Sequence, residues 1–151
     1  MKKRESYQID HHPWVLEQRQ AGDNLEGLLE PLSGRAWETV ISHGDCAPWN
    51  LRACPRGLMA FDWEYGRLDG LPYLDLAYYL LQTAALIYRW SPSRAYDFAV
   101  RYLEKNEFAL EIGEISAIVT LAAYTAYKQA SLDGQPPDSR LQCWRSAIWR
   151  K

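Results

Sequence analysis

Apolar residues recur at helical spacing through the second half of the chain, and this spacing restricts the fold more than any other feature. A first helix is expected to begin in the turn at Pro72, with apolar side chains on one face: Leu74, Ala77, Tyr78, Leu81, Ala85 and Tyr88. Leu76, Leu80 and Ile87 cover a second face, so we expect this helix to be buried nearly all round. The same spacing predicts helices over about 91–106, 112–130 and 138–149, so that 72–150 forms the helical remainder of the fold.

Shorter elements are expected before this helical part. The stretch 13–32 has helical character and is interrupted at Gly22-Asp23-Asn24, where the asparagine is a suitable N-cap for a second short helix. A strand is expected over 38–42, because Val40 and Ile41 give this segment β-branched character.

A β-hairpin is expected near the middle of the chain. Two short strands, 51–53 and 58–61, flank a Pro55-Arg56-Gly57 turn. The segment 43–50 before this hairpin contains both glycine and proline, so it is predicted to be a loop. The fold class is therefore expected to be mostly α with a small β-hairpin.

The composition argues against several classes of protein. A net charge of −2 provides no excess of basic residues for a nucleic-acid partner. The longest apolar stretch, 74–87, is interrupted by Asp75 and Gln82 and is too short for a membrane span. No signal peptide is recognised, and a reducing cytoplasm is the default expectation. The three cysteines show neither paired spacing nor an even count, which argues against a disulfide framework and a zinc site.

Three oxygen-bearing side chains stand at a spacing that suits phosphoryl transfer. Asp45 and Asn50 lie in the loop 43–50, and Asp62 follows the expected hairpin. Protein kinases place an aspartate and an asparagine at the same spacing, with a second aspartate further on. The chemistry requires a carboxylate beside the attacking hydroxyl and hard oxygen ligands for magnesium on the nucleotide phosphates. A loop followed by a hairpin is suited to bringing such groups to one cleft.

These segments resemble the aminoglycoside phosphotransferase and choline kinase superfamily, whose members are small-molecule kinases with a protein-kinase-like fold. The resemblance rests on three segments in the same order: HGDCAPWN at 43–50, FDWEYG at 61–66 and GLPYLDLA at 70–77. It covers roughly 24–90 well and the rest only as a helical tail. It implies that 1–151 is a single kinase-like C-terminal lobe, with a catalytic loop at 43–50 and a metal-binding loop at 61–66.

The resemblance implies a role for each matching residue. Asp45 corresponds to the catalytic base. Asn50 and Asp62 correspond to the ligands of the magnesium ion that accompanies ATP. His43 corresponds to a loop histidine that is mainly structural, and Asp75 to an aspartate that braces the catalytic loop through backbone hydrogen bonds. Asp75 equally fits an ordinary first-turn aspartate, which the helix macrodipole favours.

Two residues of the second segment are candidate substrate contacts. The string FDWEY is closer to the choline-kinase version, in which the glutamate at the position of Glu64 lies near the bound cationic substrate. A solvated or structural carboxylate is the alternative interpretation of Glu64. Trp63 either packs against the loop or stacks on a substrate.

The N-terminal lobe that binds the nucleotide phosphates in kinases is not recognised in this sequence. Only 42 residues precede His43, and they contain neither G-x-G-x-x-G nor a run of strands that carries a lysine. We therefore expect a kinase-like C-terminal lobe lacking the N-terminal β lobe. The expected function is transfer of the ATP γ-phosphate to a hydroxyl of a small molecule, incomplete without an N-terminal lobe or partner chain.

Two other functions stay open at this point. The chain could be a catalytically silent binding or scaffold domain that retained the loop. A metal-dependent hydrolase built on His43, Asp45 and Asp62 is a weaker alternative, because two-metal hydrolases generally use more histidine and carboxylate ligands.

Overall fold

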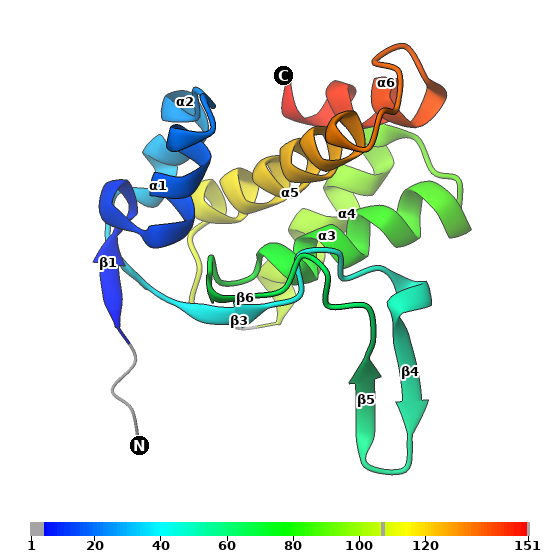
Figure 1. Cartoon of the computed structure of the whole chain (residues 1–151), viewed down its shortest axis with the longest axis horizontal. Helices are drawn as coiled ribbons and strands as arrows, with labels where there is room; N and C mark the ends of the chain where they lie inside the picture. Colours follow the sequence, from blue (N-terminus) through cyan, green and yellow to red (C-terminus); the bar gives the residue numbers. More distant parts are fainter. Residues whose placement is uncertain (1–4, 107, 151) are drawn as a thin grey trace.

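Helices make up most of the described chain. The computed structural model describes residues 5–106 and 108–150, and Figure 1 shows the arrangement of its elements. The α-helices are α1 (Pro13–Gln20), α2 (Glu26–Leu29), α3 (Leu74–Gln82), α4 (Pro92–Lys105), α5 (Ile112–Leu132) and α6 (Arg140–Trp149). Short 3-10 helices lie at Ile9–His11, Glu30–Leu32 and Pro48–Asn50, and a π-helical turn, Thr83–Ile87, extends α3. The prediction of a mostly helical fold with a small hairpin is confirmed.

The helix ends follow local capping chemistry. The hydroxyl of Ser91 accepts a hydrogen bond from the backbone N–H of Arg94 and caps α4. The start of α3 differs from the prediction, because Pro72 lies before the helix. Tyr73, at the N-cap, has a left-handed backbone with φ of 66°, so the helix begins only at Leu74.

The turn of the hairpin is shorter than the expected Pro55-Arg56-Gly57 turn. β4 (Leu51–Cys54) pairs with β5 (Gly57–Ala60) in antiparallel register, with Cys54 opposite Gly57. The connecting turn is therefore Pro55-Arg56 alone. Gly57 belongs to the strand, and its φ of 126° is a conformation that glycine adopts without steric cost.

Two further antiparallel pairs complete the strands of the described chain. The expected strand 38–42 is divided at Thr39, because its two parts pair with different partners. β2 (Ala36–Glu38) pairs with β1 (Ser6–Gln8), and β3 (Val40–Ser42) pairs with β6 (Arg67–Gly70). Neither β1 nor β6 was predicted, since three or four residues without apolar alternation give no strand signal.

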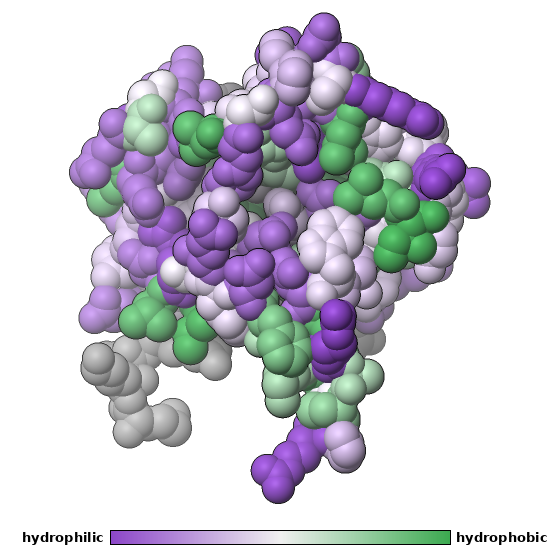
Figure 2. Space-filling model, turned by 45° about the vertical axis from the view of Figure 1, so that its right-hand side comes forward, coloured by the Kyte–Doolittle hydropathy of each residue, from purple (hydrophilic) through white to green (hydrophobic). Residues whose placement is uncertain are grey.

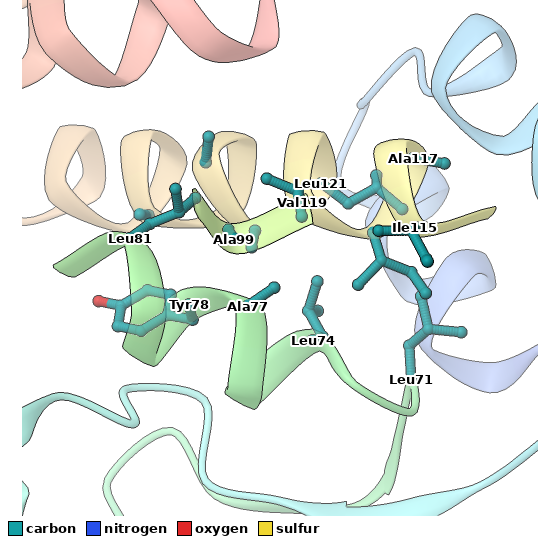
Figure 3. Packing of buried hydrophobic residues seen from close by; sticks show 14 of the residues in the cluster. Leu71, Leu74, Ala77, Tyr78, Leu81, Ala99, Ile115, Ala117, Val119 and Leu121 are labelled. Carbon is teal, nitrogen blue, oxygen red and sulfur yellow. The ribbon is translucent and has the colours of Figure 1, made fainter. Parts of the chain in front are cut away.

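The core lies around α5, which packs against α3, α4 and α6. Because α5 has neighbours on several sides, it is apolar nearly all round. Its buried residues include Ile115, Ile118, Val119, Leu121, Ala122 and Ala126. Figure 3 shows Leu74, Ala77 and Leu81 of α3 directed at this helix. The same packing fixes α3 as a rigid support for the loop 43–50.

The hairpin projects away from the helical layer, whereas β3 and β6 run side by side next to α3 (Figure 1). Large apolar side chains are exposed along these elements and the adjoining loops: Ile41, Trp49, Leu58, Met59, Phe61, Trp63 and Leu68. Figure 2 shows hydrophobic side chains at the base of the projecting hairpin. Among the described residues, no helix is both long and apolar enough to cross a membrane.

Candidate functional site

The carboxylate of Asp75 holds the backbone at the start of the loop 43–50. This residue stands in the first turn of α3. Its Oδ2 accepts the backbone N–H of His43 at 2.5 Å, and its Oδ1 accepts the N–H of Gly44 at 3.0 Å and the hydroxyl of Ser42 at 3.1 Å. The helix N-terminus also favours a negative charge here. Asp75 is thus both a first-turn residue and the anchor that ties the loop to a rigid helix.

Gly44 allows this loop to lie against the segment that follows the hairpin. Its φ is +80°, which an L side chain adopts only with strain. A Cβ at this position would also collide with the carbonyl oxygen of Tyr65. The glycine therefore permits a close approach between the loop 43–50 and the segment 61–66.

Both ring nitrogens of His43 are engaged inside the protein. Nδ1 accepts the backbone N–H of Asp45 at 3.3 Å, and Nε2 lies 2.6 Å from the carbonyl oxygen of Phe61. A carbonyl only accepts, so Nε2 carries the proton and the ring is the neutral tautomer. The ring is buried and packs against Trp63, with ring centroids 4.7 Å apart. His43 therefore acts as a structural cross-link between the two segments.

The carboxylate of Asp45 accepts a hydrogen bond at each oxygen. The side-chain amide of Asn50 donates to Oδ2 at 3.0 Å and to the backbone carbonyl of Asp45 at 2.9 Å. The hydroxyl of Tyr78 donates to Oδ1 at 2.7 Å. The half-buried carboxylate is thus held in one orientation by two side chains, which is the condition that a positioned general base requires.

Asp62 is brought next to Asn50 by the backbone. The N–H of Phe61 donates to the carbonyl of Asn50 at 2.8 Å, which continues the β4–β5 pairing by one residue. Since the carbonyl of Phe61 is bound by His43, Phe61 is fixed on both sides. Asp62 itself is exposed and has a left-handed backbone with φ of 60°. Aspartate is one of the non-glycine residues that adopt this conformation most readily.

The oxygens of Asn50 and Asp62 are suitable magnesium ligands. Because the amide nitrogen of Asn50 is bound to Asp45, its Oδ1 points elsewhere and has no hydrogen-bond partner among the described residues. The carboxylate of Asp62 is likewise free of hydrogen bonds and ion pairs within the described chain. Two oxygen donors from the protein do not complete the coordination of magnesium. Magnesium generally takes its other ligands from phosphates and water. In the described residues, no group of three or more His, Cys, Asp or Glu side chains could hold a metal.

A cavity of about 650 Å³ opens beside the loop, between α1, α3 and α5. Its wall includes Ser42 and Gly44 from the loop region, and Asp75 and Tyr78 from α3. Asp45 is not part of the wall. Its carboxylate accepts a hydrogen bond from Tyr78, and Tyr78 is part of the wall. α1 and α5 contribute further lining residues, among them the polar side chains of Gln18, Thr125, Lys128 and Gln129. The cavity therefore adjoins the hydrogen-bonded network of Asp45 through Tyr78, while Asp45, Asn50 and Asp62 lie outside its wall.

The two candidate substrate residues occupy different places. Glu64 lines the cavity and is exposed. Trp63 is not among the lining residues; its ring lies on His43, and its indole N–H donates to the carbonyl of Ala60 at 3.0 Å. Trp63 thus packs on the loop, whereas Glu64 is available to a bound molecule.

Cys46 follows Asp45 in the loop and is half-buried. Burial raises the pKa of its thiol to about 11, and the charges of Asp75 and Asp45 add to this effect. The thiol is therefore protonated at neutral pH, and a protonated thiol is a poor nucleophile. Cys46 is therefore not an activated nucleophile beside Asp45.

The structure brings together most of the residues singled out from the sequence. His43, Asp45, Asn50 and Asp75 share one hydrogen-bonded network, and Asp62 adjoins it through Phe61. Tyr78 was assigned only to the helix core, although its position three residues after Asp75 places both side chains on one face of α3. Comparison with protein-family models, curated proteins and solved structures finds no match to this chain.

Proposed function

We propose that this chain is the catalytic and magnesium-binding part of a small-molecule phosphotransferase with a protein-kinase-like C-terminal lobe. The proposed reaction is transfer of the γ-phosphate of ATP to a hydroxyl group. The observation that carries the proposal is the bonding around the loop 43–50. Asn50 and Tyr78 orient the carboxylate of Asp45, and the hydrogen bonds of Phe61 hold Asp62 alongside. In phosphoryl transfer, positioning of such groups provides most of the catalysis.

Each residue has a defined part in the proposed reaction. Asp45 orients the substrate hydroxyl and accepts its proton as the oxygen attacks the γ-phosphorus, while the bond to the β-phosphate breaks and ADP leaves. Asn50 and Asp62 would hold magnesium, which would supply positive charge to offset that of the nucleotide phosphates. His43 and Asp75 keep the two segments in register without contacting the reacting atoms.

The charges of the cavity favour a cationic amine as the substrate. Arg67 is paired with Glu17 and Asp69, and Lys128 is paired with Asp23, so both cations in the wall are neutralised. Glu64 has no ion-pair partner among the described residues, which leaves a negative charge for an ammonium group. Binding of a small amino alcohol should therefore exceed that of a neutral polyol of similar size. Equal or better binding of the polyol would remove the cationic preference from the proposal.

The nucleotide would be gripped by an N-terminal lobe or a separate partner chain. The exposed apolar side chains at the hairpin and at β3 and β6 support this part of the proposal, because contiguous exposed apolar surface commonly marks an interaction site. On this basis the isolated chain should show little or no turnover. Rapid ATP-dependent phosphorylation of an amino alcohol by the purified chain would contradict the need for a partner.

A catalytically silent binding or scaffold domain is the second candidate. The observation that favours it is that every sheet of the described chain has two strands. None of these pairs provides the β lobe and lysine that hold the nucleotide phosphates in kinases.

Calorimetric titration with Mg²⁺ and with Mg²⁺–ATP separates the two candidates. A working half-site should bind the metal, and Asp62→Ala should abolish this binding, whereas Asp138→Ala should leave it unchanged. Asp138 is a suitable control because it is an exposed aspartate outside the loops 43–50 and 61–66. A wild-type chain that shows no response to metal or nucleotide supports the silent domain.

A further inference from the structure

Helix α3 meets the loop 43–50 with two polar side chains from one face. Asp75 binds the backbone of the loop, and Tyr78, three residues later, binds the side chain of Asp45. Residues three apart on a helix are neighbours. One rigid helix therefore determines both where the loop lies and how the carboxylate of Asp45 is turned.

We propose that Tyr78 is a positioning residue, whose hydroxyl holds the carboxylate of Asp45 in the orientation that a general base needs. This inference rests on the proposed phosphotransferase function, because it gives Tyr78 a part in that reaction. Tyr78 acts through Asp45 and need not touch the reacting phosphate.

The geometry of Tyr78 suits it to this part. Its side chain is buried at 9% exposure, and Figure 3 shows its hydroxyl pointing away from Leu74 and Ala77 at the edge of the core. The ring is therefore held by packing while the hydroxyl reaches the polar loop. Hydrogen bonds to an ionised acceptor are stronger than neutral ones, so the 2.7 Å contact is well able to restrict a half-buried carboxylate.

The surroundings of Tyr78 keep its hydroxyl protonated and thus able to donate. Burial is the largest cause that raises the pKa of this phenol, followed by its hydrogen bond to Asp45 and the charge of that carboxylate. At neutral pH the hydroxyl therefore remains a donor to Asp45. It cannot serve as a phenolate base, so positioning is the part that its chemistry permits.

Arg145 of α6 adds a positive charge to the same region. Its side chain is buried at 7% exposure, and it forms no ion pair among the described residues. One of its nitrogens donates to Gln142 at 2.9 Å, while its Nε has no partner. Burial lowers the pKa of this guanidinium, and its electrostatic interactions with Tyr78 and Asp45 oppose that effect. Arg145 therefore helps to offset the cost of keeping a negative charge beside Tyr78.

The test uses NMR spectroscopy of the whole chain and needs no turnover. In the wild type, the two Nδ2 protons of Asn50 should have well-separated shifts, because they donate to Asp45. Tyr78→Phe removes one hydroxyl and keeps the packed ring, and we expect the Asn50 shifts to move towards those of a free side-chain amide. Tyr79→Phe is the matched control, since it removes a neighbouring hydroxyl for which no hydrogen bond is observed in the described chain.

A reciprocal variant makes the test independent of how Tyr78→Phe folds. In the wild type the hydroxyl proton of Tyr78 should exchange slowly because it is bound to Asp45. Asp45→Ala should abolish this slow exchange, while Tyr79→Phe should leave it in place. Unchanged Asn50 shifts in folded Tyr78→Phe would overturn the proposal, as would a Tyr78 hydroxyl proton that survives Asp45→Ala. Magnesium titration of the wild type tests the proposed phosphotransferase function separately. Failure of the positioning role of Tyr78 can therefore be distinguished from failure of the proposed function.

Discussion

The side-chain amide of Asn50 donates to Asp45 twice, at 2.9 Å to the backbone carbonyl and at 3.0 Å to the carboxylate. This arrangement uses the nitrogen of Asn50 to hold the proposed base and leaves the oxygen of Asn50 for a metal. The proposed base and the proposed metal site are therefore coupled through the side chain of Asn50. A substitution of Asn50 should alter both the orientation of Asp45 and the binding of metal.

Asn50→Asp should destabilise the fold by about 2–3 kcal/mol at neutral pH, because it replaces a buried donor with an acceptor that faces a carboxylate. Urea unfolding measures this loss. Asn24→Asp is the matched control, since Asn24 is exposed and uses its side chain as an acceptor for the N–H of Glu26, which aspartate also does. A similar loss in both variants would show that the donor role of Asn50 is unimportant.

Asp75→Asn should lower the free energy of unfolding by roughly 2–3 kcal/mol, since a charged acceptor of three hydrogen bonds is lost and an amide donor faces backbone N–H groups. Chemical denaturation compared with Asp97→Asn provides the measurement, because Asp97 is exposed on α4. Equal stability of the two variants would mean that Asp75 does not brace the loop.

Gly44→Ala should cost more stability than Gly134→Ala, by roughly 1–3 kcal/mol. Both glycines have a left-handed backbone, with φ of 80° and 84°, so both variants share the conformational strain. A Cβ meets Tyr65 only at Gly44, whereas nothing lies within 4 Å of one at Gly134. Thermal unfolding of the two variants isolates the clash, and indistinguishable midpoints would argue against close contact between the two segments.

Much of the candidate site can be predicted from the sequence, because it depends on the spacing of residues that are close together in the chain. The loop 43–50, the hairpin and the first-turn position of Asp75 follow from glycine, proline and helical periodicity. The contact between Tyr78 and Asp45 could not be read in this way, because a tyrosine at helical spacing has the same pattern whether its hydroxyl meets water or a carboxylate. β6 was missed for a related reason: Arg67, Leu68 and Asp69 show no strand pattern, and only pairing with β3 extends them.

Cys46 should react slowly with a neutral alkylating reagent. Burial raises the pKa of its thiol from 9.0 to about 11, so at pH 8 its thiolate fraction should be roughly 100-fold below that of an ordinary thiol. The chain with Cys54→Ser and Cys143→Ser measures this rate, and the same protein in urea is the control. Fast alkylation of the folded protein at pH 8 would contradict the burial of Cys46.

The same pKa shift predicts a change of stability with pH. The unfolded thiol loses its proton near pH 9, while the folded one holds it until about pH 11. The stabilisation from Cys46 is therefore complete below pH 9 and is lost as the pH rises towards 11. Cys46→Ser should show a smaller decline across this range in urea titrations.

Asn50 and Asp62 are proposed to form one metal half-site beside Asp45, and a titration with Mn²⁺, followed by NMR line broadening, probes this arrangement. The side-chain amide of Asn50 and the backbone amide of Asp62 should broaden first, and Asp62→Ala should remove the effect at both. Broadening that begins elsewhere, or that persists in Asp62→Ala, would show that these two residues do not share a metal.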